Sequence, residues 1–133
     1  MKALLIIFII FIIVDIGIIG YVLYRRFGKK LSPKKKQEIQ KAWRSIIRLT
    51  DPRRAILDAD NLLDHALGEL GYRGTLGGKL KKNPKLFSDI DAIWSAHKVR
   101  NNIAHQIHYE VNPKVYKKTM LAFKQAFTDL KFF

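Results

Sequence analysis

A short string at residues 100–105, RNNIAH, contains the residue types that cleavage of RNA without a metal ion requires. Such cleavage needs a base that takes the proton from the ribose 2′-hydroxyl and a fixed cation that holds the charge building up on phosphorus. Histidine suits the first role and arginine the second. The attacking hydroxyl belongs to the substrate, so DNA is expected to resist. Arg100, Asn101 and His105 are therefore the candidate catalytic residues.

Other polar residues continue the face of the expected helix that carries this string. From Ile90 onwards, the stripe that faces the core at helical spacing is expected to include His97, Asn101, Ala104 and His108, with Arg100 and His105 on its borders. Because buried polar groups need hydrogen-bond partners, this stripe predicts a structural network, a partner surface or an active site.

These readings assign different partners to the same side chains. In a structural network, His97 and Asn101 would bond to backbone groups or to Asp58 and Asp60. In a site, RNA or a protein partner would contact His97, Lys98, His108 and Tyr109. The acidic residues Asp58, Asp60 and Asp64 are expected to pair with Arg100, Lys98 or His97 rather than to act as an acid/base pair.

Two other kinds of site are not supported by the residues. The glycines of YRGTLGGKLKKNP do not form a phosphate-binding loop, because Arg73 stands where the first glycine belongs and Leu80 replaces the hydroxyl residue. His97, His105 and His108 could ligate a metal, but the chain has no cysteine and no H-E-x-x-H pattern. We expect neither a metal nor another cofactor.

Prolines indicate the elements that would position these residues. All four follow a short polar residue, in Ser32-Pro33, Asp51-Pro52, Asn83-Pro84 and Asn112-Pro113. Each pair suits an N-cap and a first helical residue, so we expect four helix starts. A junction at Thr50-Asp51 would join two antiparallel helices, and Gly71 would end the second. One helical turn is expected within residues 76–82.

Apolar spacing extends these starts into helices. The first carries Ile39, Ala42, Trp43, Ile46 and Ile47, and the second carries Ile56, Ala59, Leu63, Ala66, Leu67 and Leu70. A third helix is expected from Phe87 or Ser88 to Ile107, with Ile90, Ile93 and Trp94 inside. A fourth would bury Tyr116, Met120, Phe123, Phe127 and Leu130. The fold class is therefore all-α, a four-helix and mainly up-and-down bundle.

An apolar run precedes the bundle. Residues 3–24, ALLIIFIIFIIVDIGIIGYVLY, contain one ionisable group, Asp15, and at about 1.5 Å per residue cover about 33 Å, which matches a bilayer core. A cleaved signal sequence would have a shorter run and a small-residue cleavage site. We expect a transmembrane anchor at 1–24, a basic juxtamembrane linker at 25–32 and a helical domain at 33–133.

Charge predicts orientation. Of the 25 basic and 11 acidic residues, twelve basic and two acidic lie in residues 25–54, whereas only Lys2 precedes the span. Basic flanks remain on the cytoplasmic side, so the domain should be cytoplasmic and the span should lie in an inner or plasma membrane. Lipid headgroups or nucleic-acid phosphates would contact the basic cluster that follows the span, Arg25, Arg26, Lys29, Lys30, Lys34, Lys35 and Lys36.

The motif and its setting resemble the HEPN superfamily, whose motif is Arg, a polar residue, three to five further residues and His. The similarity covers about residues 51–131 and is most specific over AILDADNLLDHALGELGYRGTLGGKL and LFSDIDAIWSAHKVRNNIAHQ, which look like small, membrane-anchored bacterial HEPN-like proteins. Toxin members carry Tyr two residues after the His, where this chain has Ile107.

The resemblance implies a function and a mechanism. It implies a homodimer in which Arg100 binds phosphate, Asn101 orients and His105 acts as base or acid, leaving a 2′,3′-cyclic phosphate. The expected function is thus a membrane-tethered, metal-independent endoribonuclease in stress response or phage defence, with an antitoxin or regulatory protein as a candidate partner. The alternative is a non-catalytic HEPN-like module that binds RNA, nucleotide or a protein at the membrane.

Overall fold

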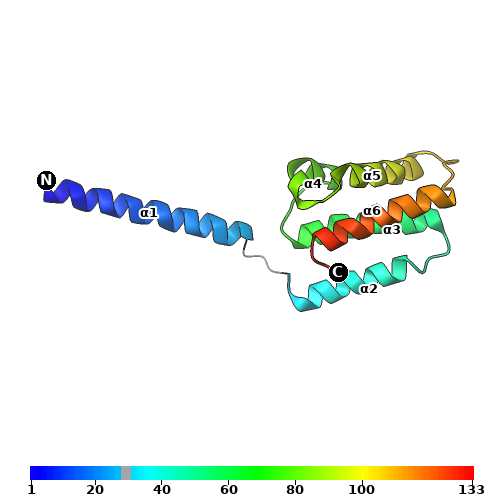
Figure 1. The fold of residues 1–133 in the computed structure, drawn as a ribbon, viewed down its shortest axis with the longest axis horizontal. Coiled ribbons are helices and arrows are strands. Elements are labelled where there is room, and N and C mark those ends of the chain that lie inside the picture. Colours follow the sequence, from blue (N-terminus) through cyan, green and yellow to red (C-terminus); the bar gives the residue numbers. More distant parts are fainter. Residues whose placement is uncertain (28–30) are drawn as a thin grey trace. The chain divides into compact units, whose positions relative to one another are not determined.

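The computed structural model describes residues 1–27 and 31–133, without the side chains of residues 2–3 and 23–27. All regular structure in these residues is helical (Figure 1). The chain divides into two compact units, Met1–Lys30 and Leu31–Phe133.

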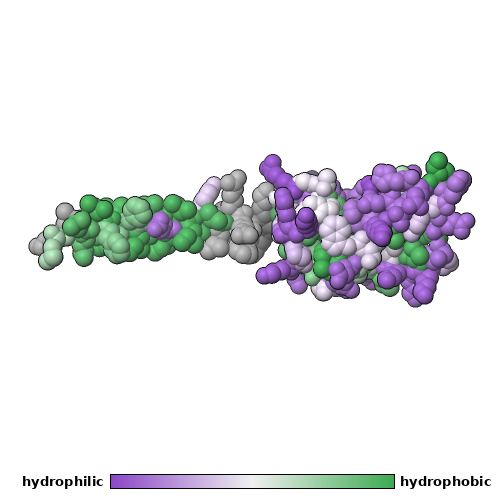
Figure 2. All heavy atoms as spheres, turned by 90° about the horizontal axis from the view of Figure 1, so that it is seen from above, coloured by the Kyte–Doolittle hydropathy of each residue, from purple (hydrophilic) through white to green (hydrophobic). Residues whose placement is uncertain are grey.

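The first unit is a single helix, α1 (Lys2–Phe27). Within it, Leu4–Val22 is long and apolar enough to cross a membrane, and none of this segment is buried against protein. Figure 2 accordingly shows α1 covered mainly by hydrophobic side chains, whereas the face of the second unit that it displays is mainly hydrophilic. The helix continues three residues beyond the anchor boundary expected at residue 24.

The second unit begins with two helices that start where the prolines predict. Ser32 caps α2 (Pro33–Ile46) and Asp51 caps α3 (Pro52–Glu69), each by accepting a backbone N–H in the first turn. The end of α3 at Gly71 is also confirmed: Gly71 has φ +94°, and the N–H of Tyr72 closes the helix on the carbonyl of Leu67.

The connection that follows contains one short helix and one turn. Residues Leu76–Lys82 form α4, with Thr75 as its cap; its seven residues make about two turns, where one turn is expected from the sequence. The helix expected after Asn83-Pro84 is only a single 3₁₀ turn, η1 (Pro84–Leu86). The reason is local, because the Asn83 side chain donates to the Lys79 carbonyl at 2.9 Å instead of capping a new helix.

The helix that carries the polar string is α5 (Ile90–His105), capped by Asp89. The expected range of Phe87 or Ser88 to Ile107 was therefore too long at both ends. At the C-terminal end the chain is held by Arg53 of α3, whose Nη1 donates to the Tyr109 carbonyl at 2.6 Å and whose Nη2 donates to the Ile103 carbonyl at 3.4 Å.

The last helix, α6 (Pro113–Asp129), starts at the Asn112 cap as predicted. Figure 1 shows α2 and α5 running in one direction and α3 and α6 in the other, so the four long helices form an up-and-down bundle. Helix α3 lies at its centre, in contact with α2, α5 and α6. Asp129, at the end of α6, accepts from the backbone N–H and hydroxyl of Ser88.

The core contains most of the apolar residues that spacing predicted, among them Ile39, Trp43, Ile46, Ile56, Leu63, Leu67, Ile93, Phe123 and Phe127. Two expected core residues are exposed instead. Ile47 follows the end of α2 and is 51% exposed, and Trp94 on α5 is 37% exposed. Helical spacing predicts Ile47 as part of a helix that ends one residue earlier. Trp94 lies on the face of α5 beside Gly77 of α4, which covers the ring in part.

Candidate functional site

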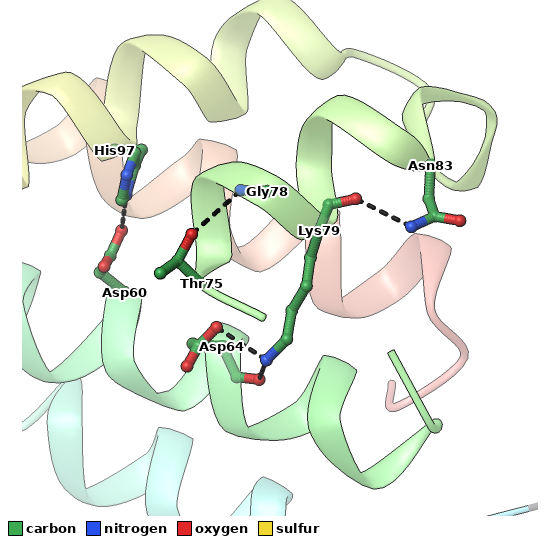
Figure 3. Close-up of polar contacts among 7 residues, drawn as sticks. All are labelled: Asp60, Asp64, Thr75, Gly78, Lys79, Asn83 and His97. Atoms are coloured by element: carbon green, nitrogen blue, oxygen red, sulfur yellow. Dashed lines mark hydrogen bonds and ion pairs between the residues drawn. The ribbon is translucent and has the colours of Figure 1, made fainter. Parts of the chain in front are cut away.

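The most buried polar contact in the bundle joins α3 to α5. The side chain of Asp60, on α3, is 4% exposed, and its Oδ1 lies 2.7 Å from Nδ1 of His97 on α5 (Figure 3). An ionised carboxylate can only accept, so Nδ1 of His97 donates and Nε2 is left free to exchange a proton. The expectation that Asp60 pairs with His97 or Arg100 is confirmed for both residues.

Arg100 lies one turn beyond His97 on α5. Its Nε is 3.3 Å from Oδ2 of Asp60, close enough for an ion pair, yet the N–H does not form a hydrogen bond with that oxygen. Nη1 donates to the side-chain oxygen of Asn101 at 3.2 Å. The Arg100 side chain as a whole is 29% exposed. One buried carboxylate thus holds two of the polar residues on α5, and the third, Asn101, is held through Arg100.

These side chains line a cavity of about 370 Å³ between three elements. Its lining comes from α3, from the start of α4 with its cap, and from α5: Asp60, Asn61, Asp64, Thr75, Leu76, Gly77, His97, Arg100 and Asn101. Seven of these nine residues have polar or charged side chains. Its size lies within the range of small-molecule sites in proteins.

Helix α4 is held in place as one wall of this cavity. Figure 3 shows the hydroxyl of Thr75 against the N–H of Gly78, and Lys79 reaching across to α3. Nζ of Lys79 donates to both the backbone carbonyl and Oδ1 of Asp64 at 2.8 Å. The Lys79 side chain is 6% exposed, whereas that of Asp64 is 41% exposed. A buried ammonium ion therefore fixes α4 to α3.

Gly77 of α4 faces Trp94 and His97 of α5, with room for one additional carbon atom between them. A Cβ at this position would lie 3.6 Å from the Trp94 ring and 3.8 Å from Nε2 of His97. The ring of Trp94 stands edge-on to that of His97, with centroids 6.0 Å apart. The free nitrogen of His97 is therefore directed at the wall that Gly77 forms.

Not all of the predicted site residues come together. Arg100, Asn101 and His97 line the cavity, but His105, the last residue of α5, does not and is exposed to solvent. Within the described residues its side chain has no hydrogen-bond partner. The stripe expected to face the core is therefore wrong beyond Asn101, since Ala104 is also exposed and His108 lies outside the helix.

The predicted contact residues around the motif divide in the same way. Lys98 and His108 are exposed and lie outside the cavity. Tyr109 is half-buried and lines a separate hollow of about 390 Å³ with Arg53 and the caps of α3 and α6. Asp58 does not join Asp60, because it pairs with Arg54 at 3.4 Å.

The basic cluster is described only in part. Lys34 and Lys35 are exposed and Lys36 is half-buried at the start of α2, where Lys35 pairs with Glu69 of α3. Lys29 and Lys30, and the side chains of Arg25 and Arg26, lie outside the described residues. Among the residues described, no group of three or more His, Asp or Glu side chains is placed to hold a metal ion.

Asp60 organises the site, a role that the sequence pattern does not predict. The pattern predicts Asp60 only as a partner of cations. A signal was present: Asp60 lies four residues after Ile56 and three before Leu63, within the apolar stripe of α3. A carboxylate inside a core stripe needs buried partners, and only α5 offers a histidine and an arginine one turn apart. Thr75 and Gly77 carried no comparable signal.

Comparison of the chain with models of protein families, with curated proteins and with solved structures finds no match. The site is therefore interpreted from its own geometry and chemistry.

Proposed function

We propose that this chain is a membrane-tethered, metal-independent endoribonuclease of the HEPN type that acts as a homodimer. The observation that carries the proposal is the cavity between α3, α4 and α5, where Arg100 and Asn101 of the motif lie beside a histidine held by a buried carboxylate. The exposure of His105 on the same helix adds to this support, because a histidine that must reach a substrate cannot be buried in the core.

The proposed reaction needs only the substrate's own hydroxyl. The 2′-oxygen attacks the adjacent phosphorus, the bond from phosphorus to the 5′-oxygen breaks, and a 2′,3′-cyclic phosphate remains. One proton leaves the 2′-hydroxyl and one is delivered to the departing 5′-oxygen. Arg100 would hold the charge on the non-bridging oxygens through its outer nitrogens, since its Nε faces Asp60.

A second copy of the chain would complete this site. Arg100 and His105 are five residues apart, which on an α-helix is about 7.5 Å along the axis and about 140° around it. One copy therefore presents the two side chains in different directions. A two-fold axis beside α5 would bring His105 of one copy to Arg100 of the other, in the composite arrangement that the HEPN resemblance implies.

The tether is part of the proposal. The apolar segment Leu4–Val22 would span an inner or plasma membrane, with the basic residues after it on the cytoplasmic side. RNA is available in that compartment. Confinement to a membrane raises the local concentration of the bundles and so favours a dimer that is weak in solution.

One observation favours a second candidate, a non-catalytic module that binds RNA, nucleotide or a protein partner. The carboxylate of Asp60 lies against Arg100 and offsets much of the positive charge that would attract a phosphate. A site of this kind could hold a polar ligand without stabilising the transition state of phosphoryl transfer.

The test uses the full chain in detergent micelles, incubated with single-stranded RNA in the presence of EDTA. Arg100→Ala and His105→Ala are compared with wild type and with His65→Gln, a matched control at an exposed histidine of α3. We expect products that end in a 2′,3′-cyclic phosphate from wild type and from the control, and a loss of at least about 100-fold in both motif variants.

Mixed dimers test the composite site. When Arg100→Ala and His105→Ala chains are coexpressed, each heterodimer has one site with both residues intact, so activity returns. Absence of cleavage by every protein would support the binding module. Equal cleavage by wild type and both motif variants would refute the assignment of the motif.

A further inference from the structure

We propose that His97, oriented by Asp60, is the base that takes the proton from the 2′-hydroxyl, and that His105 serves as the acid that protonates the leaving 5′-oxygen. This inference rests on the proposed ribonuclease function. It assigns to the catalytic site a residue outside the Arg-Asn-x-x-x-His motif, and it gives the motif histidine one role instead of two.

A short hydrogen bond from His97 to Asp60 orients the ring. The two atoms are 2.7 Å apart, and the carboxylate that accepts is 4% exposed, so water competes little for it. A buried carboxylate that holds one ring nitrogen fixes the tautomer and the orientation of the imidazole, and it stabilises the imidazolium formed when the other nitrogen takes a proton. Asp60 is thus a positioning residue for His97.

The other ring nitrogen of His97, Nε2, lies on the side of the cavity. Nε2 of His97 faces Gly77, where the absence of a side chain leaves room, and both residues line the cavity. The His97 side chain is 16% exposed, and its Nε2 is not among the buried polar atoms that lack a partner. The base is therefore presented toward the cavity rather than toward the core.

His97 lies beside two residues of the motif. It shares the cavity with Arg100 and Asn101, whereas His105 of the same copy lies outside. A phosphate held by Arg100 would place the neighbouring ribose within the same cavity as His97. The proton balance then closes: His97 gains the proton of the 2′-hydroxyl, and His105 of the second copy gives one to the 5′-oxygen as the bond to phosphorus breaks.

The experiment separates base from acid by the leaving group. Each protein is used as the full chain in micelles and is given RNA with either a 5′-oxygen or a 5′-sulfur at the scissile bond. The proteins compared are wild type, His97→Asn, His105→Ala and the His65→Gln control. A sulfur leaving group departs without a proton, so loss of the acid no longer matters. Asparagine keeps a donor for Asp60 while removing the free ring nitrogen, which preserves the contact between α3 and α5.

We expect His97→Asn to lower the single-turnover rate by about 100-fold or more on both substrates. His105→Ala should lose a similar factor on the oxygen substrate and recover on the sulfur substrate. Asp60→Asn should also lower the single-turnover rate at saturating RNA on both substrates, because His97 loses the carboxylate that orients its ring. A purely structural role of His97 would also slow both substrates, so the pH dependence of the single-turnover rate decides between the two roles. Loss of the base should remove the rise of the rate with pH on the acidic side of the wild-type profile, whereas a structural loss would lower the whole profile without changing its shape.

Gly77→Ala is a second variant that leaves the histidine and its carboxylate intact. The added methyl would lie 3.8 Å from Nε2, an ordinary contact that the fold tolerates, and would occupy the space in front of this nitrogen. We expect a slower rate with a thermal stability at least equal to that of wild type, because alanine is the better helix former.

The outcomes are distinct. If wild type does not cleave RNA, both the proposed function and this inference fail. If wild type cleaves RNA and both His97→Asn and Gly77→Ala cleave it at the wild-type rate, the role of His97 is overturned while the proposed ribonuclease function stands. Recovery of His97→Asn on the sulfur substrate would also overturn it, because the histidine would then be an acid.

Discussion

Replacing Lys79 by methionine tests how the wall of the cavity is held. Methionine keeps most of the length and apolar volume of the lysine stem but removes the ammonium group that donates to Asp64 at two positions. Hydrogen bonds from charged groups contribute about 1.5–3 kcal/mol each when they are buried. Their loss is the main term in the free-energy change.

Two features of the structure reduce this figure. The Asp64 side chain is 41% exposed, so its carboxylate regains water when the lysine is lost. The lysine itself is 6% exposed, so the wild-type protein bears the cost of removing an ammonium ion from water, and the methionine variant does not. The net loss of stability is therefore expected to be about 1–2 kcal/mol, or about 4–16 °C in Tm for a unit of this size.

The assay is urea and thermal unfolding of the full chain in micelles, followed by circular dichroism. Lys82→Met, an exposed lysine in the same helix, is the matched control and should change stability by less than about 0.5 kcal/mol. The reasoning is refuted if Lys79→Met is as stable as wild type, or if the control is destabilised to the same extent.

Three further outcomes are expected. Burial raises the pKa of Asp129, but hydrogen bonds from Ser88 and Gln125 and the charge of Lys131 outweigh it and hold the pKa below its ordinary value. Asp129→Ala should therefore cost about 1–2 kcal/mol at pH 7 in urea unfolding, and the deficit should narrow as the pH falls below about 4, because the unfolded chain then takes up a proton on this carboxyl before the folded chain does. Phe127→Ala should cost about 3–5 kcal/mol in the same assay, because this ring is fully buried against Trp43. The chain should stay with membranes through alkaline carbonate extraction, whereas release into the supernatant would contradict a spanning α1.

The starts of the helices could be predicted from sequence because their cause is local. Ser32, Asp51 and Asn112 each bond to a backbone N–H within three residues, and the following proline suits the first helical position. Asn83 breaks the pattern because its side chain turns back to α4. An N-cap motif indicates where a helix can start, but it does not exclude a competing acceptor nearby.

The end of α5 could not be predicted from sequence because its cause is remote. No glycine or proline stops the helix after His105; instead Arg53, about fifty residues earlier, takes the carbonyls of Ile103 and Tyr109. The organising role of Asp60 could not be predicted for the same reason, because its partners lie on α5, far along the chain. Sequence identified Arg100, Asn101 and His97 as polar residues on one face, but only packing shows which of them share a carboxylate.

Docking of the short helix α4 reports whether the cavity is occupied by a ligand. Seven residues are too few for a helix that persists alone in water, so α4 exists because Thr75 caps it and Lys79 fastens it to α3. Undocking of α4 removes one wall of the cavity, and any molecule that fills the cavity must therefore oppose this undocking. Hydrogen exchange at the amides of Lys79 and Leu80 thus becomes a direct report of ligand binding, one that needs neither catalysis nor a labelled substrate.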